Sequence, residues 1–260
     1  MKYLLELGLT AMASSANQDN WFYGHIGACI LAISFFLEEI DLKGDLTNVG
    51  LNKVKEIIGQ HKEIFIDEFL NSGEKSSLDQ IIDSTNENIK YFSADGHGVI
   101  YAALALKAIK KRNQNVSSSL VQSISKLVSS AQNDNLKRYW SIEDYKETKP
   151  DLSEIPEFGT VYAAASYCLN NQKNIVNNTK IDESMYYFAG SRLHEVTHSH
   201  ALVLLDQMNY SDIAHSGIIN LRKQIFFNKQ IPSNLYPIRS KLQIFTNTNM
   251  LIPCTLYYRF

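Results

Sequence analysis

Three of the seven histidines of this chain of 260 residues lie close together in the segment LHEVTHSHALVLL at 193–205. Imidazole is costly to bury unless a hydrogen bond or a metal ion compensates it, and the segment becomes apolar directly after the last histidine. In a helix, His194 and His198 share a face, because residues four apart differ by about 40° around the axis. His194 and His200 differ by about 120°, so the spacing favours His194 with His198 as metal ligands.

Two further histidines, His25 and His97, each follow a glycine and each open an apolar segment. A single histidine at a helix start more often bonds a carbonyl than binds a metal, but the set as a whole favours a metal site. Neutral imidazoles suit iron, zinc and other divalent transition metals equally well. We expect the ligands to come from five histidines, which are His25, His97, His194, His198 and His200.

Of the two remaining histidines, His61 is expected to be a packing residue and the role of His215 is open. His61 falls in register with an apolar stripe within 51–70, which predicts a partly buried packing residue. His215 lies in the first turn of a helix that Ser211 or Asp212 could cap.

The segments NWFYGHIGACILAI, DGHGVIYAALAL and LHEVTHSHALVLL resemble the histidine-bearing helices of the questin oxidase-like family, over roughly residues 20 to 210. The resemblance implies an all-helical, non-haem iron oxygenase that uses dioxygen on polycyclic aromatic polyketides such as anthraquinones. The family pattern matches His25, His97, His194 and His200. It has no counterpart of His198, so the spacing and the resemblance differ on the last ligand.

Two features of the resemblance are incomplete in this chain. The chain is much shorter than typical fungal members of the family. One branch of the family resembles an iron enzyme whose site is completed by a carboxylated lysine, for which Lys107 and Lys180 are candidates without a recognisable motif. A π-bulge or an irregular helix start at Thr197 would bring all three histidines of 193–205 inward.

Carboxylates and aromatic residues accompany the histidines. Glu195 and Asp95 could orient histidine N–H groups, although for Asp95 we favour a cap on the helix that begins near His97. Aromatic side chains could line a substrate pocket or belong to the core. These are Trp21, Phe22, Tyr23, Phe92, Tyr101, Phe158 and Tyr162.

Helical periodicity covers most of the chain and predicts an all-α fold. Amphipathic helices, expected at 51–70 and 117–132, alternate with segments that are apolar on nearly every side and must therefore be buried. These segments are 25–37, 97–109, 159–169 and 200–208. The alternation suggests helical hairpins around a central cavity, like an α/α toroid, in one domain over 1–260 with a short irregular C-terminal tail after residue 230.

Composition excludes several classes of protein. A net charge of -2 and a pI of about 6.4 argue against nucleic-acid binding. Three distant cysteines favour a reducing cytoplasm, Glu6 interrupts what would otherwise resemble a signal peptide, and no apolar run reaches the length of a membrane span. No P-loop, Rossmann glycine pattern or nucleophile elbow is present, so we expect no nucleotide or flavin.

Three functions remain compatible with these features. The first is an iron-dependent oxygenase that acts on an aromatic small molecule. The second is a helical scaffold without catalysis that binds a ligand or partner. The third is a metal-dependent hydrolase or cyclase on an α/α toroid, in which a metal-bound water or another nucleophile reacts.

Overall fold

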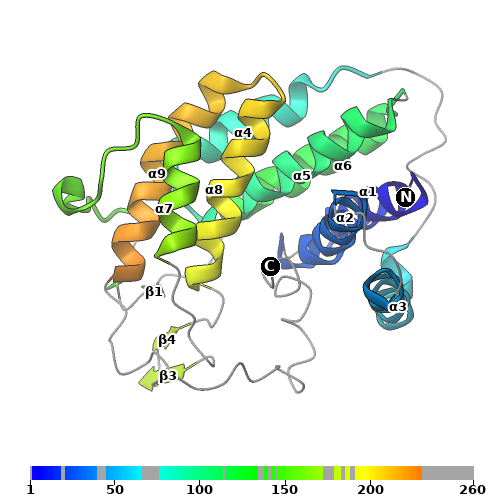
Figure 1. The fold of residues 1–260 in the computed structure, drawn as a ribbon, viewed down its shortest axis with the longest axis horizontal. Coiled ribbons are helices and arrows are strands. Elements are labelled where there is room, and N and C mark those ends of the chain that lie inside the picture. Colours follow the sequence, from blue (N-terminus) through cyan, green and yellow to red (C-terminus); the bar gives the residue numbers. More distant parts are fainter. Residues whose placement is uncertain are drawn as a thin grey trace. The chain divides into compact units, whose positions relative to one another are not determined.

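A computed structural model describes residues 2–18, 21–39, 45–65, 76–113, 115–133, 138–139, 142–143, 146–171, 179–182, 185–187 and 191–229. The fold of this part of the chain is all-α, as the periodicity predicts (Figure 1). Two short antiparallel hairpins, β1 with β2 and β3 with β4, accompany the helices. The helices are α1 (Lys2–Ser15), α2 (Gly24–Glu39), α3 (Asp45–Gln60), α4 (Asp79–Lys90), α5 (His97–Arg112), α6 (Ser118–Ser130), α7 (Val161–Asn170), α8 (Ser191–Gln207) and α9 (Ser211–Lys229); the strands are β1 (Arg138–Tyr139), β2 (Ile142–Glu143), β3 (Thr179–Asp182) and β4 (Met185–Tyr187).

The chain divides into two compact units, each assembled from separate stretches of sequence. Within the described residues, unit 1 comprises 2–84 and 104–130, and unit 2 comprises 85–103 and 131–229. Helices α4 and α5 each contribute residues to both units. The closed ring of hairpins and the single domain over 1–260 stay predictions, and the C-terminal tail lies outside the described residues.

Helices α1 and α2 lie side by side in unit 1 (Figure 1). Their close approach depends on glycine, since a Cβ on Gly27 would lie 2.5 Å from the carbonyl oxygen of Gly8. Val54 and Ile57 of α3 pack on the same core. The segment 25–37 is therefore largely buried, as its apolar composition predicts.

One described stretch, Trp21–Glu38, is apolar and long enough to cross a membrane. Because 61% of it is buried inside the protein, it also fits the core helix of a folded domain.

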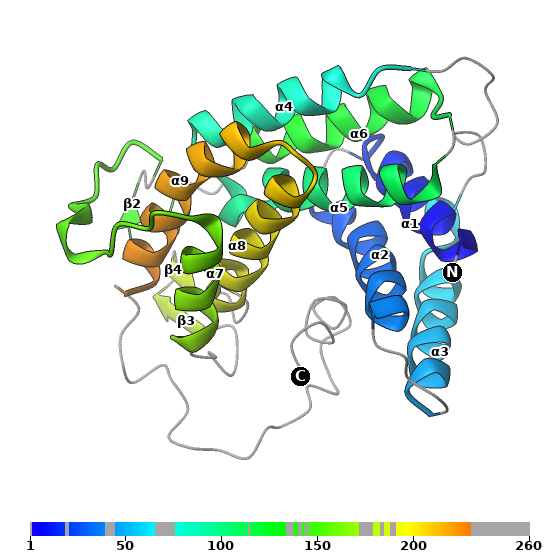
Figure 2. The same ribbon diagram turned by 45° about the horizontal axis from the view of Figure 1, so that its top comes forward.

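Helices α7, α8 and α9 lie side by side in unit 2 (Figures 1 and 2). Gly217 of α9 faces Leu202 of α8 so closely that a Cβ on the glycine would come within 2.4 Å of the leucine side chain. This contact sets the separation of the two helices that carry the buried polar side chains described below.

Two sequence expectations about the helices are wrong. The amphipathic helix expected over 51–70 ends at Gln60, and a 3-10 turn (η2, Lys62–Ile64) follows it; residues 66–70 lie outside the described part. The segment 159–169 is not buried on every side, since Tyr162 is 51% exposed and Leu169 is 57% exposed. The partial burial expected of His61 is confirmed, because 26% of its side chain is exposed.

Candidate metal centre

Helix α8 carries three of the candidate ligands and is a regular α-helix from residue 191 to 207. The hydroxyl of Thr197 donates to the carbonyl of His194 at 3.2 Å, a local bond that leaves the helix intact. Neither the π-bulge nor the irregular helix start that would bring all three histidines inward is present at Thr197. In a regular helix His200 points about 120° away from His194, whereas His194 and His198 share a face and lie about 6 Å apart along the axis. The different surroundings of His194 and His198 therefore come from what packs against each of them.

The chain enters α5 through a short turn (η4, Ala94–Gly96) in which all three residues have positive φ: 44° for Ala94, 55° for Asp95 and 82° for Gly96. This left-handed conformation is costly for residues other than glycine and is common at functional sites. Glycine is required at 96 for a second reason, because a Cβ there would lie 2.7 Å from the ring of His198. The turn places Asp95 two residues before His97 and buries both side chains.

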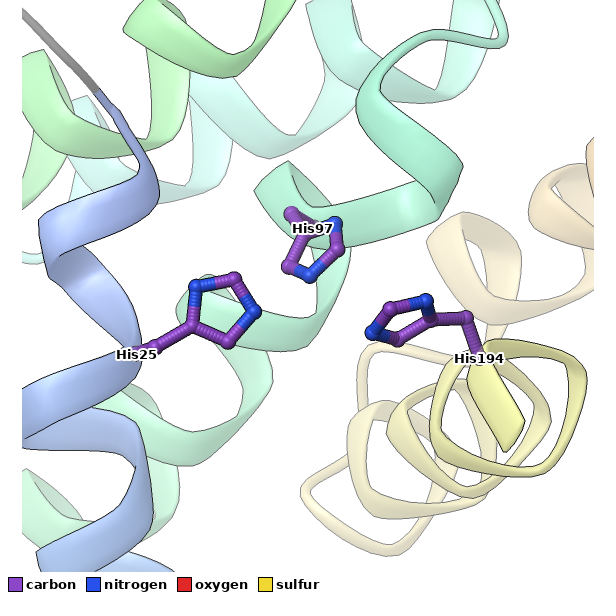
Figure 3. A group of neighbouring side chains, drawn as sticks. All are labelled: His25, His97 and His194. Carbon is purple, nitrogen blue, oxygen red and sulfur yellow. The ribbon is translucent and has the colours of Figure 1, made fainter. Parts of the chain in front are cut away.

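His97 and His194 approach each other within unit 2, with ring centroids 4.4 Å apart and ring planes at 67° (Figure 3). A ligating nitrogen of one ring lies within 4.8 Å of a ligating nitrogen of the other. His97 begins α5 and His194 lies in the first turn of α8, so helices distant in sequence supply the two rings.

Asp95 determines which nitrogen of His194 carries the proton. The Nδ1 atom of His194 lies 2.7 Å from Oδ2 of Asp95, whose side chain is 2% exposed. A carboxylate accepts hydrogen bonds, so Nδ1 is the protonated nitrogen and Nε2 carries the lone pair. A histidine that donates to a carboxylate through one nitrogen and binds a metal through the other is a recurrent arrangement in metal sites.

His97 and His25 have the same tautomer for a different reason. The Nδ1 atom of His97 donates to the carbonyl oxygen of Ala94, and that of His25 donates to the carbonyl oxygen of Phe22 at 2.7 Å. In both cases the acceptor is three residues earlier, at the start of the helix. The carbonyl bond expected of such histidines is thus compatible with metal binding, since Nε2 carries the lone pair.

Among the residues that the structure describes, His97 and His194 of unit 2 could hold a metal ion together, and His25 of unit 1 is the third candidate ligand. Figure 3 draws the three side chains on α2, α5 and α8. His25 and His97 are buried and His194 is partly buried. Three neutral imidazoles suit iron and zinc alike, so the donor set does not distinguish these metals.

His198 and His200 do not belong to that group. His198 is 1% exposed, and its Nδ1 donates to Oε1 of Gln224 at 2.9 Å. Burial lowers the pKa of His198, which favours the neutral imidazole. His200 is half-buried on the same helix. The structure thus leaves His198, which the helical spacing favours as a second ligand, outside the group that contains His194.

Gln224 and Asn220 are buried polar residues that the sequence analysis did not identify. Gln224 is 0% exposed, and its Nε2 donates to Oδ1 of Asp95 at 2.5 Å. Asn220, one turn earlier on α9, is 2% exposed and donates to the carbonyl of Ile89. The signal in the sequence was the spacing of polar amides at 220, 224 and 228 within an otherwise apolar helix face, which predicts buried hydrogen bonds.

The lysines considered for a modified ligand receive no support. Lys107 lies ten residues after His97 on α5, about 15 Å along the helix, and its Nζ lies 4.5 Å above the ring of Phe35. Lys180 is on β3, and its side chain lies outside the described part. Of the two candidate carboxylates, Asp95 has the orienting role for His194, and Glu195 is buried with 1% exposure.

Aromatic rings lie beside His25 and His97. The ring of Phe22 lies 4.3 Å from that of His25, and Trp21 lies 6.2 Å from it; both aromatic side chains are half-buried. Tyr101 is fully buried beside His97, at 5.6 Å. Other expected pocket residues have different surroundings: Phe92 stacks on Phe227, Phe158 contacts Tyr167, and Tyr23 and Tyr162 are exposed.

No family model matches the sequence, and neither a curated protein nor a solved structure is significantly similar to it.

Proposed function

We propose that the protein is a metal-dependent oxygenase in which His97 and His194 of unit 2 hold one non-haem iron ion, with His25 as the third ligand that the sequence predicts. The observation that carries the proposal is the shared tautomer of the three histidines, each of which donates from Nδ1 to an oxygen acceptor. Three Nε2 lone pairs form a neutral donor set that fits a divalent transition metal and leaves other coordination positions to substrate and dioxygen.

Asp95 supports the same assignment. Its carboxylate holds the Nδ1 proton of His194, fixes the direction of the ring and makes Nε2 a stronger donor. The buried carboxylate also offsets part of the positive charge that an ion adds to a site of neutral ligands.

The proposed substrate is a polycyclic aromatic molecule that carries hydroxyl groups. The half-buried rings of Trp21 and Phe22 beside His25 offer a surface on which a flat aromatic molecule could stack. The resemblance of the histidine segments to the questin oxidase-like family supports this substrate class. When bound, iron(II) would supply the redox chemistry by which dioxygen reacts with such a molecule.

A zinc-dependent hydrolase or cyclase is the second candidate. The contact between Asp95 and His194 is the carboxylate–histidine pair that also accompanies catalytic zinc. In that case the three histidines would hold zinc, and a bound water would be the nucleophile. Metal content and oxygen uptake separate the two candidates.

The test uses the full chain, purified with a tag that contains no histidine, and elemental analysis of the protein. We expect about one iron per chain, a stoichiometry set by three ligands to one ion. His25→Ala, His97→Ala and His194→Ala should each lose the metal while circular dichroism shows an unchanged helix content. The matched controls, His61→Ala and His215→Ala, should retain it, since neither belongs to the histidine group.

Oxygen uptake by the reduced, iron-loaded protein then tests the reaction, with a hydroxyanthraquinone as the substrate probe. Uptake that depends on the probe and disappears in His194→Ala supports an oxygenase. Zinc in place of iron, without oxygen uptake, supports the second candidate. A wild-type protein that binds neither iron nor zinc, or a metal retained by His194→Ala, would overturn the metal centre and favour the non-catalytic scaffold.

A further inference from the structure

We infer that Gln224 of α9 is a positioning residue of this centre: it holds the Asp95 carboxylate in the orientation that presents Nε2 of His194. The inference rests on the proposed metal site and extends it to a helix that carries none of the three ligands. Gln224 is 0% exposed and contacts both Asp95 and His198. A buried amide with two charged or polar neighbours is costly unless its hydrogen bonds are satisfied.

The direction of the Gln224 amide follows from its neighbours. Its Nε2 atom lies 2.5 Å from Oδ1 and 3.2 Å from the backbone oxygen of Asp95, and both of these atoms are acceptors. The NH2 group must therefore face Asp95. Its Oε1 atom then lies 2.9 Å from Nδ1 of His198, which is the donor of that bond.

Asp95 thus receives two side-chain donors on two different oxygens, with Gln224 on Oδ1 and His194 on Oδ2. A carboxylate held at both oxygens cannot rotate without breaking one bond. The left-handed backbone of Asp95, with φ of 55°, needs such contacts to hold it in place. Gln224 therefore acts on the metal site through Asp95 and His194 rather than by binding the ion.

This geometry predicts that glutamine at 224 cannot be replaced by glutamate. Gln224→Glu has the same shape but places a carboxylate oxygen against Oδ1 of Asp95, at the position where Nε2 now donates over 2.5 Å. The variant removes a donor and adds a like charge, so Asp95 should turn away from His194. The exchange Asp95→Asn with Gln224→Glu restores one amide and one carboxylate in reversed order.

The test measures the affinity of Co²⁺, a spectroscopic probe for iron and zinc sites, by competition with a chelator. Gln224→Glu and Gln224→Leu should each weaken binding about 10- to 100-fold, as removal of outer hydrogen-bond partners of ligands does elsewhere. The double variant should bind Co²⁺ as tightly as Asp95→Asn alone, because the glutamate at 224 then faces an amide donor rather than a like charge. Asn220→Leu is the matched control, because Asn220 is buried one turn earlier on α9 and bonds Ile89 rather than Asp95.

The outcomes separate the inference from the proposed function. Wild-type affinity in Gln224→Glu, or an equal loss in Asn220→Leu, overturns the positioning role while the metal site stands. If the wild-type protein binds no metal, the proposed function fails, and ¹⁵N spectra of the imidazoles decide the inference. The signal of His194, identified because it is missing from the spectrum of His194→Ala, should then show protonation at Nδ1 in the wild type. The same signal should shift in Gln224→Glu, and an unchanged signal overturns the inference.

Discussion

The Nδ1 atom of His194 lies 2.7 Å from Oδ2 of Asp95, although 99 residues separate them in the sequence. This contact joins the turn before α5 to the first turn of α8 within unit 2. It fixes the proton of His194 on Nδ1 and leaves the lone pair on Nε2.

Replacement of Asp95 by asparagine should weaken metal binding about 10- to 100-fold, because the neutral amide holds the Nδ1 proton less strongly and lowers the donor strength of Nε2. Titration with Zn²⁺ against a chromophoric chelator measures the change. Asp151→Asn is the control, since that exposed carboxylate accepts a local hydrogen bond from the backbone of Ser153 at 2.9 Å. Equal affinity in the two variants would show that Asp95 does not support the site.

Replacement of Gly96 by alanine should lower the free energy of unfolding by about 1–3 kcal/mol, the cost of a residue with a side chain held in a left-handed conformation. The backbone at Gly96 has φ of 82°, and the added Cβ would lie 2.7 Å from the ring of His198. Urea denaturation measures the loss. Gly59→Ala, with nothing within 4 Å of its added Cβ in α3, should instead stabilise the protein by up to about 1 kcal/mol. A Gly96→Ala variant as stable as the wild type would contradict the strained turn.

Acid should destabilise the protein through His198. Burial lowers the pKa of His198 below its ordinary value of 6.5, so the unfolded chain binds a proton on this residue more readily than the folded chain does. The contribution of His198 to stability is therefore complete above pH 6.5 and falls as the pH drops toward the folded pKa. Urea denaturation of metal-free protein at pH 7.5 and 5.5 should show a smaller acid loss in His198→Asn than in the wild type. His215→Asn changes an exposed histidine and should keep the wild-type loss; identical losses in all three proteins would refute the assignment.

Replacement of Trp21 by leucine should weaken the binding of a hydroxyanthraquinone about fivefold without loss of metal. Trp21 is half-buried beside His25, and loss of one aromatic stacking partner removes about 1 kcal/mol of favourable interaction. Fluorescence quenching measures the affinity, and elemental analysis checks the metal. Tyr91→Leu, at an aromatic residue that is 67% exposed, provides the comparison. Unchanged affinity in Trp21→Leu would remove the aromatic surface from the proposed substrate site.

The sequence by itself determined the local structure around the candidate ligands. Apolar periodicity predicted α2, α5 and α8, and the glycines before His25 and His97 indicated that each histidine opens a helix. These features depend on residues within one or two turns of each other, which is why a pattern of residue types can indicate them. The same local reasoning predicted a helix over 51–70 that is too long and a segment 159–169 that is buried on every side. Both predictions are wrong because the end of a helix and the burial of each of its faces depend on neighbouring elements.

Only the tertiary structure decided which histidine of α8 has which role. Helical spacing favoured His198 as the second ligand beside His194. Packing instead gives His198 a hydrogen bond to Gln224 and gives His194 a hydrogen bond to Asp95. Gln224 and Asp95 are 129 residues apart, and their bond depends on how α9 packs on α8 and on the left-handed turn before α5. Hydrogen bonds over such separations follow from the packing of whole helices, and no local pattern of residues encodes them.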